Sequence, residues 1–384
     1  MKLLRKAGIA ILLVVGTVWA VAPSIAERRM NRVTNRSIAI SDRARVLHEK
    51  LFVADLHADT TLWNRDLLSR GARGHVDVPR LVEGGVALQA FTIVTKTPRR
   101  MNIESNTADT DNITLLAVAQ FWPPRTWNNL TERALYQASR VTSAAARSGG
   151  RLSVVRTARD LAAFETKHSS DKTAVAAFIG VEGAHALAGD LSNLDRLYDA
   201  GVRMMAPTHF FDTEIGGSAH GVSRSGLTPL GREWVARMEA KRMVIDLAHA
   251  SPATLDDVLR IATRPVVVSH TGVRGTCDNQ RNLSDAQLSA ISANGGLVGI
   301  GVWETAVCGG DAHAVARAIA HAINVAGFEH VALGSDFDGA VTAPFDVAGL
   351  PQVTQALLDL GLDQTAIEGV MGGNVRRLLK RVLP

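Results

Sequence analysis

The chain has 384 residues, of which 46% are hydrophobic, 21% are charged and only 2 are Cys, and its formal net charge is +5. The apolar content excludes a disordered chain, and two cysteines are too few for a disulfide-framework mini-protein or a Cys-rich zinc module. The length allows two ordinary domains or one large α/β barrel. A basic balance by itself favours nucleic acid or a membrane surface as partner, so the positions of the positive charges decide its meaning.

The positive charges gather at the N-terminus, on both sides of an apolar run. Lys2, Arg5 and Lys6 precede an uncharged stretch over residues 7–26, which ends in small residues near Ala26. This pattern is typical of a secretory signal peptide that is cleaved near Ala26, and the same stretch is long enough to be an uncleaved membrane anchor. Both interpretations predict export to the periplasmic or extracellular face, and both stay open.

The charge balance of the remaining chain is close to zero. Four arginines lie within residues 27–36, and we interpret residues 27–45 as a basic membrane-proximal stalk. Without residues 1–36 the chain holds 35 basic and 36 acidic residues, a net charge of −1. No basic stripe with interleaved aromatic residues is left, so nucleic-acid binding is unsupported. The predicted organisation is a signal peptide or anchor (1–26), the stalk, and one large domain (46–384).

Eight short apolar runs recur along the large domain, and each is followed by a helical pattern. They cover residues 51–57, 86–94, 174–183, 203–209, 243–249, 265–270, 296–303 and 330–339. Continuous apolar runs are typical of parallel strands buried on both faces. Helix-start signals at Thr228, Ser251 and Ser284 support the alternation. The pattern predicts an α/β fold, a single (β/α)8 barrel of the TIM type, with a doubly wound open sheet as the main alternative.

One gap between these runs is much longer than the others. It spans residues 95–173, after the second run, and it contains helical patterns near 111–121 and 129–147. We interpret this segment as a helical insertion on the barrel and not as a second domain.

Side chains of metal-ligand type stand at the ends of six of the eight runs. They are His57, Asp59, Glu182, His209, His249, His270, Asp336 and Asp338. Each one alone is as well explained by a structural role, such as a hydrogen-bonded core histidine or an ordinary Asp-Gly turn. Together they point to an active site, because barrels of this kind carry it at the carboxyl ends of their strands.

The spacing of these residues suits two metal ions. His57 and Asp59 stand at i and i+2 of an extended run, so both side chains point to one side and reach one ion. His249 and His270 end successive strands, about 4.8 Å apart in a sheet, and can bind a second ion together. Glu182 has two carboxylate oxygens and can bridge both ions. Imidazole with carboxylate suits zinc, with manganese or iron as alternatives, and two such ions activate water.

Six motifs around these residues carry a family resemblance. They are DLHADT (55–60), GVEGAH (180–185), DLAHAS (246–251), SHTGVR (269–274), RNLSD (281–285) and GSDFDG (334–339). From about Phe52 to Arg377 the chain resembles the membrane (renal) dipeptidase family, zinc peptidases of the metallo-dependent hydrolase group. The resemblance implies a (β/α)8 barrel with two zinc ions. It implies the same five ligands as the spacing does. His57 and Asp59 hold one ion, His249 and His270 hold the other, and the carboxylate of Glu182 lies between the two ions.

The resemblance also implies roles that spacing does not supply. His209 matches a histidine that contacts the substrate and the tetrahedral oxyanion. Arg281 matches an arginine that binds the free carboxylate of the substrate, and Asp336 matches the acid–base aspartate. Without the resemblance, Arg281 reads equally well as a surface ion-pair residue and His209 as a structural histidine.

Comparison with the family pattern gives expectations for three further residues. Cys277 and Cys308 fall where relatives carry a disulfide, and free buried thiols are the alternative. Trp303 stands where relatives often have a Tyr, so we expect it to affect substrate preference. The chain ends in VRRLLKRVLP, without a hydrophobic tail. We therefore expect any membrane anchor to be N-terminal.

The sequence thus predicts a zinc-dependent metallodipeptidase of the membrane-dipeptidase type. It would hydrolyse the amide bond of dipeptides by a metal-bridging hydroxide, and the resemblance extends this to a D-residue at the C-terminal position. The alternative is another binuclear amide hydrolase, such as an N-acyl-amino-acid deacylase. A non-catalytic binding protein is disfavoured because all five metal ligands are present. The expected partners are the dipeptide, the membrane if residues 1–26 stay attached, and a second copy of the chain in a homodimer.

Overall fold

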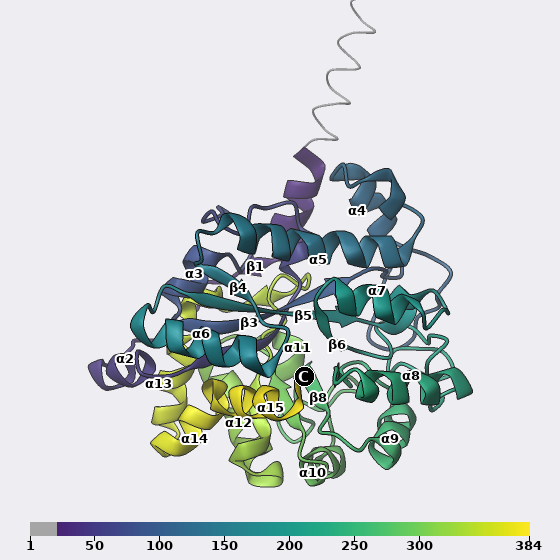
Figure 1. Cartoon of the computed structure of the whole chain (residues 1–384). Coiled ribbons are helices and arrows are strands. Elements are labelled where there is room, and N and C mark those ends of the chain that lie inside the picture. The colour runs from purple at the N-terminus through teal and green to yellow at the C-terminus, as the bar shows by residue number, and fades with distance from the viewer. Residues whose placement is uncertain (1–20) are drawn as a thin grey trace, which may run out of the picture.

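A parallel sheet of eight strands curls around the centre of the molecule (Figure 1). The computed structural model describes residues 21–384. The order of the strands is β7-β6-β5-β3-β2-β10-β9-β8, and short β4 (Leu152–Val154) pairs with β5 outside this path. The strands of the path are β2 (Val53–Ala58), β3 (Val86–Val94), β5 (Val175–Glu182), β6 (Val202–Met205), β7 (Val244–Ile245), β8 (Val267–Thr271), β9 (Leu297–Ile300) and β10 (Val331–Leu333).

The two edge strands of the curled sheet, β7 and β8, approach each other. A parallel bridge joins Asp246 to Val267, and the Leu247 N–H donates to the Val267 carbonyl at 2.7 Å. Each of the eight apolar runs of the sequence overlaps one strand of this sheet. The α/β class and the curled parallel sheet agree with a TIM-type barrel, and the contact between its edges argues against the doubly wound alternative.

Several strands end earlier than the apolar runs that predicted them. The run 243–249 contains only the two-residue strand β7, and the run 330–339 contains only β10. The backbone leaves the ladder after these strands, and His249 and Asp336 adopt left-handed φ angles of 62° and 61°. Left-handed residues do not continue a strand. The polar ends of the runs therefore form loops that aim side chains into the site.

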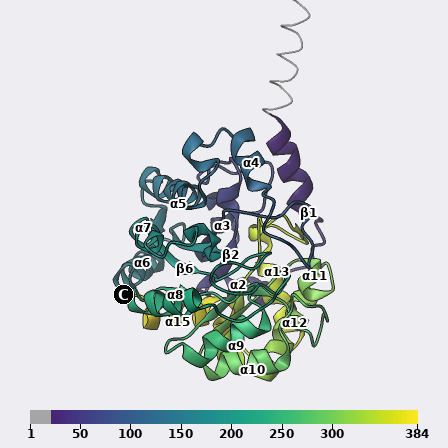
Figure 2. The same ribbon diagram turned by 90° about the vertical axis from the view of Figure 1, so that its right-hand side faces the viewer.

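Helices cover the outside of the sheet (Figures 1 and 2). Three predicted starts are confirmed: the side chains of Thr228, Ser251 and Ser284 each accept a hydrogen bond from a backbone N–H three residues on. The helices are α2 (Asp42–His48), α3 (Val78–Glu83), α4 (Ile113–Ala119), α5 (Leu130–Arg147), α6 (Ala158–Ser170), α7 (Asn193–Asp199), α8 (Pro229–Ala240), α9 (Pro252–Ile261), α10 (Asp285–Ala293), α11 (Glu304–Val307), α12 (Ala312–Ala326), α13 (Pro351–Asp359), α14 (Gln364–Glu368) and α15 (Asn374–Val382).

The long segment between β3 and β5 contains α4, α5, β4 and α6. Helices α4 and α5 lie where the sequence predicts helical stretches, near 111–121 and 129–147. In Figures 1 and 2, α4 stands at the same end of the molecule as the first helical residues of the described chain.

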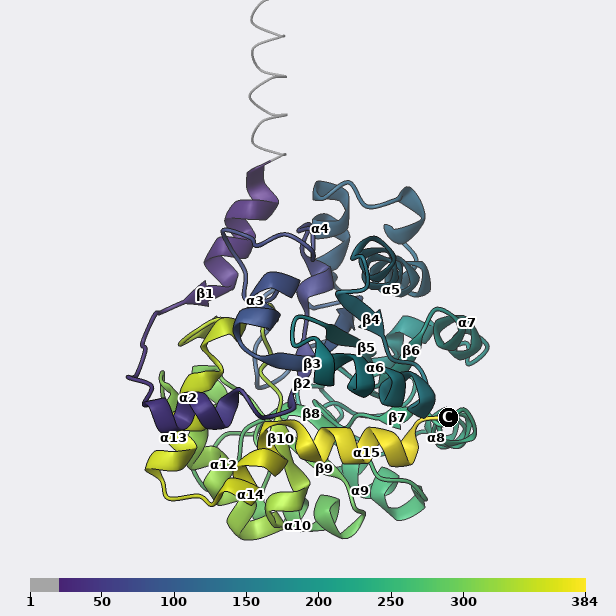
Figure 3. The same cartoon turned by 60° about the vertical axis from the view of Figure 1, so that its left-hand side comes forward.

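The last helix, α15, closes the opposite end of the sheet (Figure 3). Its Leu378 and Val382 pack into the same apolar cluster as Leu56. Arg242 and Arg264, which precede β7 and β8, both donate to the Val382 carbonyl. Because α15 covers the amino ends of the strands, only their carboxyl ends are left for a substrate to approach.

The N-terminal part of the described chain packs against the large domain. Residues 21–30 are helical, and β1 (Arg32–Val33) pairs in parallel with β11 (Thr342–Ala343). Glu27 and Asn31, in the segment predicted to form a stalk, are buried. Most of the predicted signal peptide or anchor, residues 1–20, lies outside the described residues. Within the part of the chain that the structure covers, no helix combines the length and the apolar character needed to cross a bilayer.

Candidate active site

Five predicted ligands converge on one buried point at the carboxyl ends of the strands. Glu182 Oε1 lies 2.9 Å from His249 Nε2, 3.3 Å from His270 Nε2 and 3.6 Å from His57 Nε2. Asp59 Oδ1 lies 3.5 Å from His57 Nε2. All five residues are buried, with at most 4% of their surface exposed. The glutamate is therefore central to the cluster, as the sequence predicts.

The donor atoms of this cluster fit metal ions. Nitrogen and oxygen atoms of three overlapping groups lie within 4.8 Å of one another: His57 with Glu182 and His270, Glu182 with His209 and His249, and His57 with Asp59 and Asp336. The Nε2 atom of His57 is buried without a hydrogen-bond partner, and His249 Nε2 and His270 Nε2 face each other at 3.0 Å. When both nitrogens present lone pairs, as metal-ligating imidazoles do, a cation between them removes their repulsion.

Ser269, which sequence reasoning missed, orients two of the imidazoles. Its Oγ lies 2.9 Å from His57 Nδ1 and 3.1 Å from His270 Nδ1. A hydroxyl oxygen has two acceptor lone pairs, so it can accept an Nδ1–H from each ring. The Nε2 lone pairs then point toward Glu182, which is the usual effect of outer contacts on metal-ligating histidines. Ser269 stands next to His270 in the motif SHTGVR, but its contact with His57 crosses the sheet.

The electrostatics of the cluster favour additional positive charge. Burial lowers the pKa of His57, but the carboxylates of Glu182 and Asp59 outweigh it and raise the pKa to about 10. Burial, assisted by the neighbouring Asp59 charge, raises the pKa of Glu182 well above its usual value. Burial also raises the pKa of Asp336 to about 8. Crowded carboxylates take up protons when no cation is present, and metal ions displace such protons.

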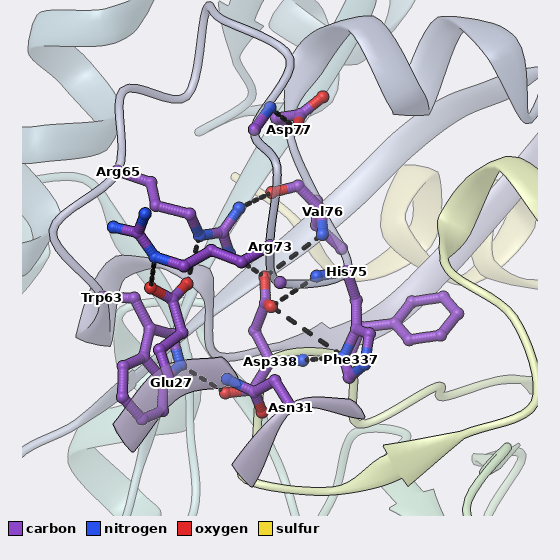
Figure 4. Close-up of polar contacts among 12 residues, drawn as sticks. Glu27, Asn31, Trp63, Arg65, Arg73, His75, Val76, Asp77, Phe337 and Asp338 are labelled. Carbon is purple, nitrogen blue, oxygen red and sulfur yellow. Dashed lines mark hydrogen bonds and ion pairs between the residues drawn. The ribbon is translucent and has the colours of Figure 1, made fainter. Parts of the chain in front are cut away.

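The two aspartates of the motif GSDFDG point to different places. Asp336 lies in the third ligand group, beside His57 and Asp59. Asp338 belongs to none of these groups. Its carboxylate instead pairs with Arg65 at 2.6 Å and accepts the N–H of His75 at 2.7 Å (Figure 4). Asp338 is a structural residue because its charge is already neutralised away from the ligands.

His209 lies beside the central glutamate. Its Nε2 is 3.2 Å from Glu182 Oε2, and burial lowers its pKa well below the usual value. A second histidine, His220, was missed because it lies in a Gly-rich loop and not at a strand end. It stacks on Phe210 at 4.8 Å, and its ring is 5.2 Å from that of His249. His220 therefore packs against the predicted ligand His249.

Arg281 is a buried cation that faces the same space. Arg281 is 7% exposed, and its Nη2 donates a hydrogen bond to the His270 carbonyl at 2.7 Å. Within residues 21–384 the guanidinium makes no ion pair with a carboxylate, and it lies 5.8 Å from the ring of Trp303. A buried charge without a counter-charge is costly, so this position suits an anionic group of a ligand.

A cleft of about 750 Å³ joins these side chains. Asp336 and Arg281 are both in its lining, together with most of the predicted ligands, while His57 is fully buried beneath it. The predicted site residues that line the cleft are Asp59, Glu182, His209, His249, His270, Arg281, Trp303 and Asp336.

Cys277 and Cys308 form a disulfide in the structure, with their Cα atoms 5.2 Å apart. Cys277 follows β8, in the loop that also carries Arg281, and Cys308 ends the short helix α11, which begins next to Trp303. The disulfide therefore ties together the two loops that present these residues to the cleft.

Replacing both cysteines with serine is expected to lower the free energy of unfolding by about 3 kcal/mol, because the bond closes a loop of moderate length. The disulfide spans a sequence separation of 31 residues. Urea unfolding of the double variant tests this, with the reduced wild-type chain as the matched control. Equal stability of the oxidised and reduced wild-type chains would contradict the expectation.

Comparison with known proteins decides the family. The sequence model of the membrane dipeptidases (peptidase family M19) matches residues 41–383. This chain belongs to the membrane dipeptidase family. The resemblance seen in the six motifs is therefore confirmed, and the ligand cluster lies in the part of the chain that matches.

The proteins to which this chain is similar match it over different lengths. An uncharacterised protein from Klebsiella pneumoniae is 34% identical over 254 residues, 62% of this chain and 91% of that protein. Dipeptidase aclJ of Aspergillus oryzae is 35% identical over 219 residues, 53% of this chain and 51% of that protein, so the chain spans about half the length of this relative. A crystal structure of a metallo peptidase from Rhodobacter sphaeroides, liganded with a phosphinate mimic of the dipeptide L-Ala-D-Ala, has 27% identity and a TM-score of 0.70, over 86% of this chain and 99% of that one.

Proposed function

We propose that this protein is a metallodipeptidase that uses two zinc ions and hydrolyses the amide bond of dipeptides. The observation that carries the proposal is the buried cluster around Glu182 with the unpaired cation of Arg281 in the same cleft. Family membership and the dipeptide mimic bound by the Rhodobacter sphaeroides relative support it. The second of these also supports acceptance of a D-residue at the C-terminal position.

We assign the residues of the cluster to two ions as the strand spacing and the family resemblance imply. His57 and Asp59 would hold one, and His249 and His270 the other, with Glu182 in contact with both. Such a pair, when bound, supplies Lewis acidity and an activated water for attack on the amide carbonyl.

The chain's own residues supply recognition and proton transfer. Arg281 would pair with the free carboxylate of the substrate, which restricts the site to short peptides because a longer chain has no carboxylate there. Burial keeps His209 neutral, so it can donate one N–H to the oxygen of the attacked carbonyl. Asp336 lies in the same ligand group as Asp59, and its raised pKa suits proton transfer near neutrality.

Arg281→Ala is expected to raise KM for dipeptides by about 10- to 100-fold, because a hydrogen-bonded charge pair contributes about 1.5–3 kcal/mol. The metal content should stay at the wild-type value, since Arg281 donates only to a backbone carbonyl of the ligand segment. Steady-state kinetics and metal analysis test both statements. Arg274→Ala, in the same loop and exposed, is the matched control. Unchanged dipeptide kinetics in Arg281→Ala would remove this residue from the site.

The alternative substrate class is the N-acyl amino acids, which carry the same carboxylate. Much of the cleft lining is apolar and would accommodate an acyl chain. Assays with L,L dipeptides, L,D dipeptides and N-acyl amino acids of the same C-terminal residue separate the two activities. We expect the higher kcat/KM for dipeptides, and the reverse order would favour the deacylase.

We further propose that the protein is exported, with residues 1–26 as signal peptide or anchor. The disulfide between Cys277 and Cys308 supports this, because such bonds persist mainly in oxidising compartments. Mass measurement of the mature chain tests it: a chain that starts near Glu27 indicates cleavage, and a full-length chain in the membrane fraction indicates an anchor. A full-length chain in the cytosolic fraction would contradict export.

A further inference from the structure

One wall of the cleft comes from the helix of residues 21–30, here called the N-terminal helix. Ala22, Ala26 and Met30 repeat at intervals of four, so they form one face of this helix, and all three line the cleft that contains Glu182 and Arg281. Pro23 joins them. The face is apolar throughout. The family match begins only at residue 41, so this wall is a feature of the chain outside the matched region.

The facing part of the cleft is apolar as well. It comes from the segment that includes α4, which lies at the same end of the molecule as the N-terminal helix in all three views (Figures 1, 2 and 3). Its lining residues are Met101, Ile103, Ile113, Leu115, Leu116 and Ala119.

Large apolar side chains in this part of the cleft stay in contact with solvent. Met30 is 45% exposed, Met101 39% and Leu115 55%, although all three line the cleft. Apolar groups that a fold leaves exposed in a concave site mark a place where an apolar ligand binds. The cleft of about 750 Å³ also has room for more than the backbone of a dipeptide.

A buried ionic cluster holds the N-terminal helix in place (Figure 4). Glu27 is 1% exposed, and its carboxylate pairs with both Arg65 and Arg73. Arg65 in turn pairs with Asp338 at 2.6 Å. One turn after Glu27, Asn31 accepts the N–H of Ala340 at 2.8 Å. The helix is thereby attached to the loop that carries the active-site aspartate.

We propose that the N-terminal helix is part of the substrate site in the chain that keeps residues 1–26 as its anchor. A mature chain that starts near Glu27 would lack Ala22, Pro23 and Ala26 and would overturn this proposal. With residues 101–119 the helix forms an apolar subsite that accepts a large apolar side chain of the dipeptide, such as Leu, Phe or Met, and Glu27 is the positioning residue that holds its wall. This inference rests on the proposed dipeptidase function. It adds a substrate class to that function: dipeptides with a large apolar side chain are preferred to those with Gly.

The test is a comparison of kcat/KM for two dipeptide series, one varied at the first residue and one at the second, each with Gly, Leu and Phe. The wild-type full-length chain is expected to favour Phe over Gly by about tenfold or more in one series. Ala26→Trp, which fills the subsite, should lower this Phe-to-Gly ratio by about tenfold. Ile25→Trp is the matched control, because Ile25 is adjacent in sequence, 49% exposed and outside the cleft lining, so its ratio should equal the wild-type ratio.

Glu27→Ala separates positioning from general stability. If Glu27 holds the wall, this variant lowers the Phe-to-Gly ratio as Ala26→Trp does. A lower melting temperature with an unchanged ratio would leave Glu27 a purely structural role and would overturn that part of the proposal. An unchanged ratio in Ala26→Trp, with active wild-type enzyme, overturns the subsite alone. A wild-type chain that hydrolyses no dipeptide overturns the proposed function, and the subsite for dipeptides with it.

Discussion

Glu182→Gln is expected to lose most of its bound metal and nearly all of its activity. The carboxylate of Glu182 is the atom group that faces His57, His249 and His270 together. The amide removes the negative charge and places an N–H2 donor in the cluster, where only acceptors can bind a cation. Because substitutions in the outer contacts of metal sites already cost about 10- to 100-fold in affinity, a loss of at least 100-fold is expected here.

Metal content after dialysis and turnover of a dipeptide measure this effect directly. Glu233→Gln is the matched control, since Glu233 is a solvent-exposed residue that pairs with Arg237 on the same helix. A Glu182→Gln chain with full zinc occupancy and normal turnover would remove Glu182 from the metal centre.

Asp336→Asn is expected to lower kcat by about 10²- to 10⁴-fold, which is the usual contribution of general acid–base catalysis. Substrate binding should change little, because Arg281 supplies the carboxylate contact. Burial raises the pKa of Asp336 to about 8, and bound cations would lower it from there. A group that acts as a base is active above its pKa, so wild-type kcat/KM should rise with pH along an acidic limb with a midpoint below 8.

The pH profile of the variant tests this role, because loss of the Asp336 carboxylate should remove that acidic limb. Asp363→Asn is the control: Asp363 caps α14 at the surface, and asparagine caps a helix equally well. If Asp336→Asn retains wild-type kcat and the same acidic limb, another group transfers the proton.

The positions of the strands and the starts of several helices could be predicted from the sequence for local reasons. Buried parallel strands such as β3 and β5 are mostly apolar, and the apolar runs predict both within one residue of their observed bounds. Ser251 and Thr228 cap the helices that follow them, and caps depend on a few neighbouring residues. The points where β7 and β10 end were not predictable, because the apolar runs continue beyond them into loops that include the left-handed residues His249 and Asp336.

The site residues that stand at strand ends could be predicted from the sequence. The other residues of the site could not. His57, Glu182 and His270 stand at the ends of long apolar runs, so topology alone brings them together. Ser269 and His220 act through contacts across the fold, which one sequence does not reveal.

The roles of charged residues were harder to predict from the sequence than the positions of buried strands. Asp338 is of metal-ligand type in the sequence, and its partner Arg65 is 273 positions away in the chain, so spacing gave no sign of the ion pair between them. Glu27 looked like one acid in a basic stalk, although its carboxylate is buried between two arginines of the large domain. Long-range ion pairs of this kind are set by tertiary structure, so sequence spacing does not predict them.

The central claim, a dipeptidase that depends on two metal ions, is tested most directly by titrating zinc into the chelator-treated full-length chain while dipeptide hydrolysis is followed. We predict that the treated chain is inactive and that activity rises with bound zinc to a plateau at two ions per chain. Full dipeptidase activity in the chelator-treated chain, or none at any zinc content, would contradict the account.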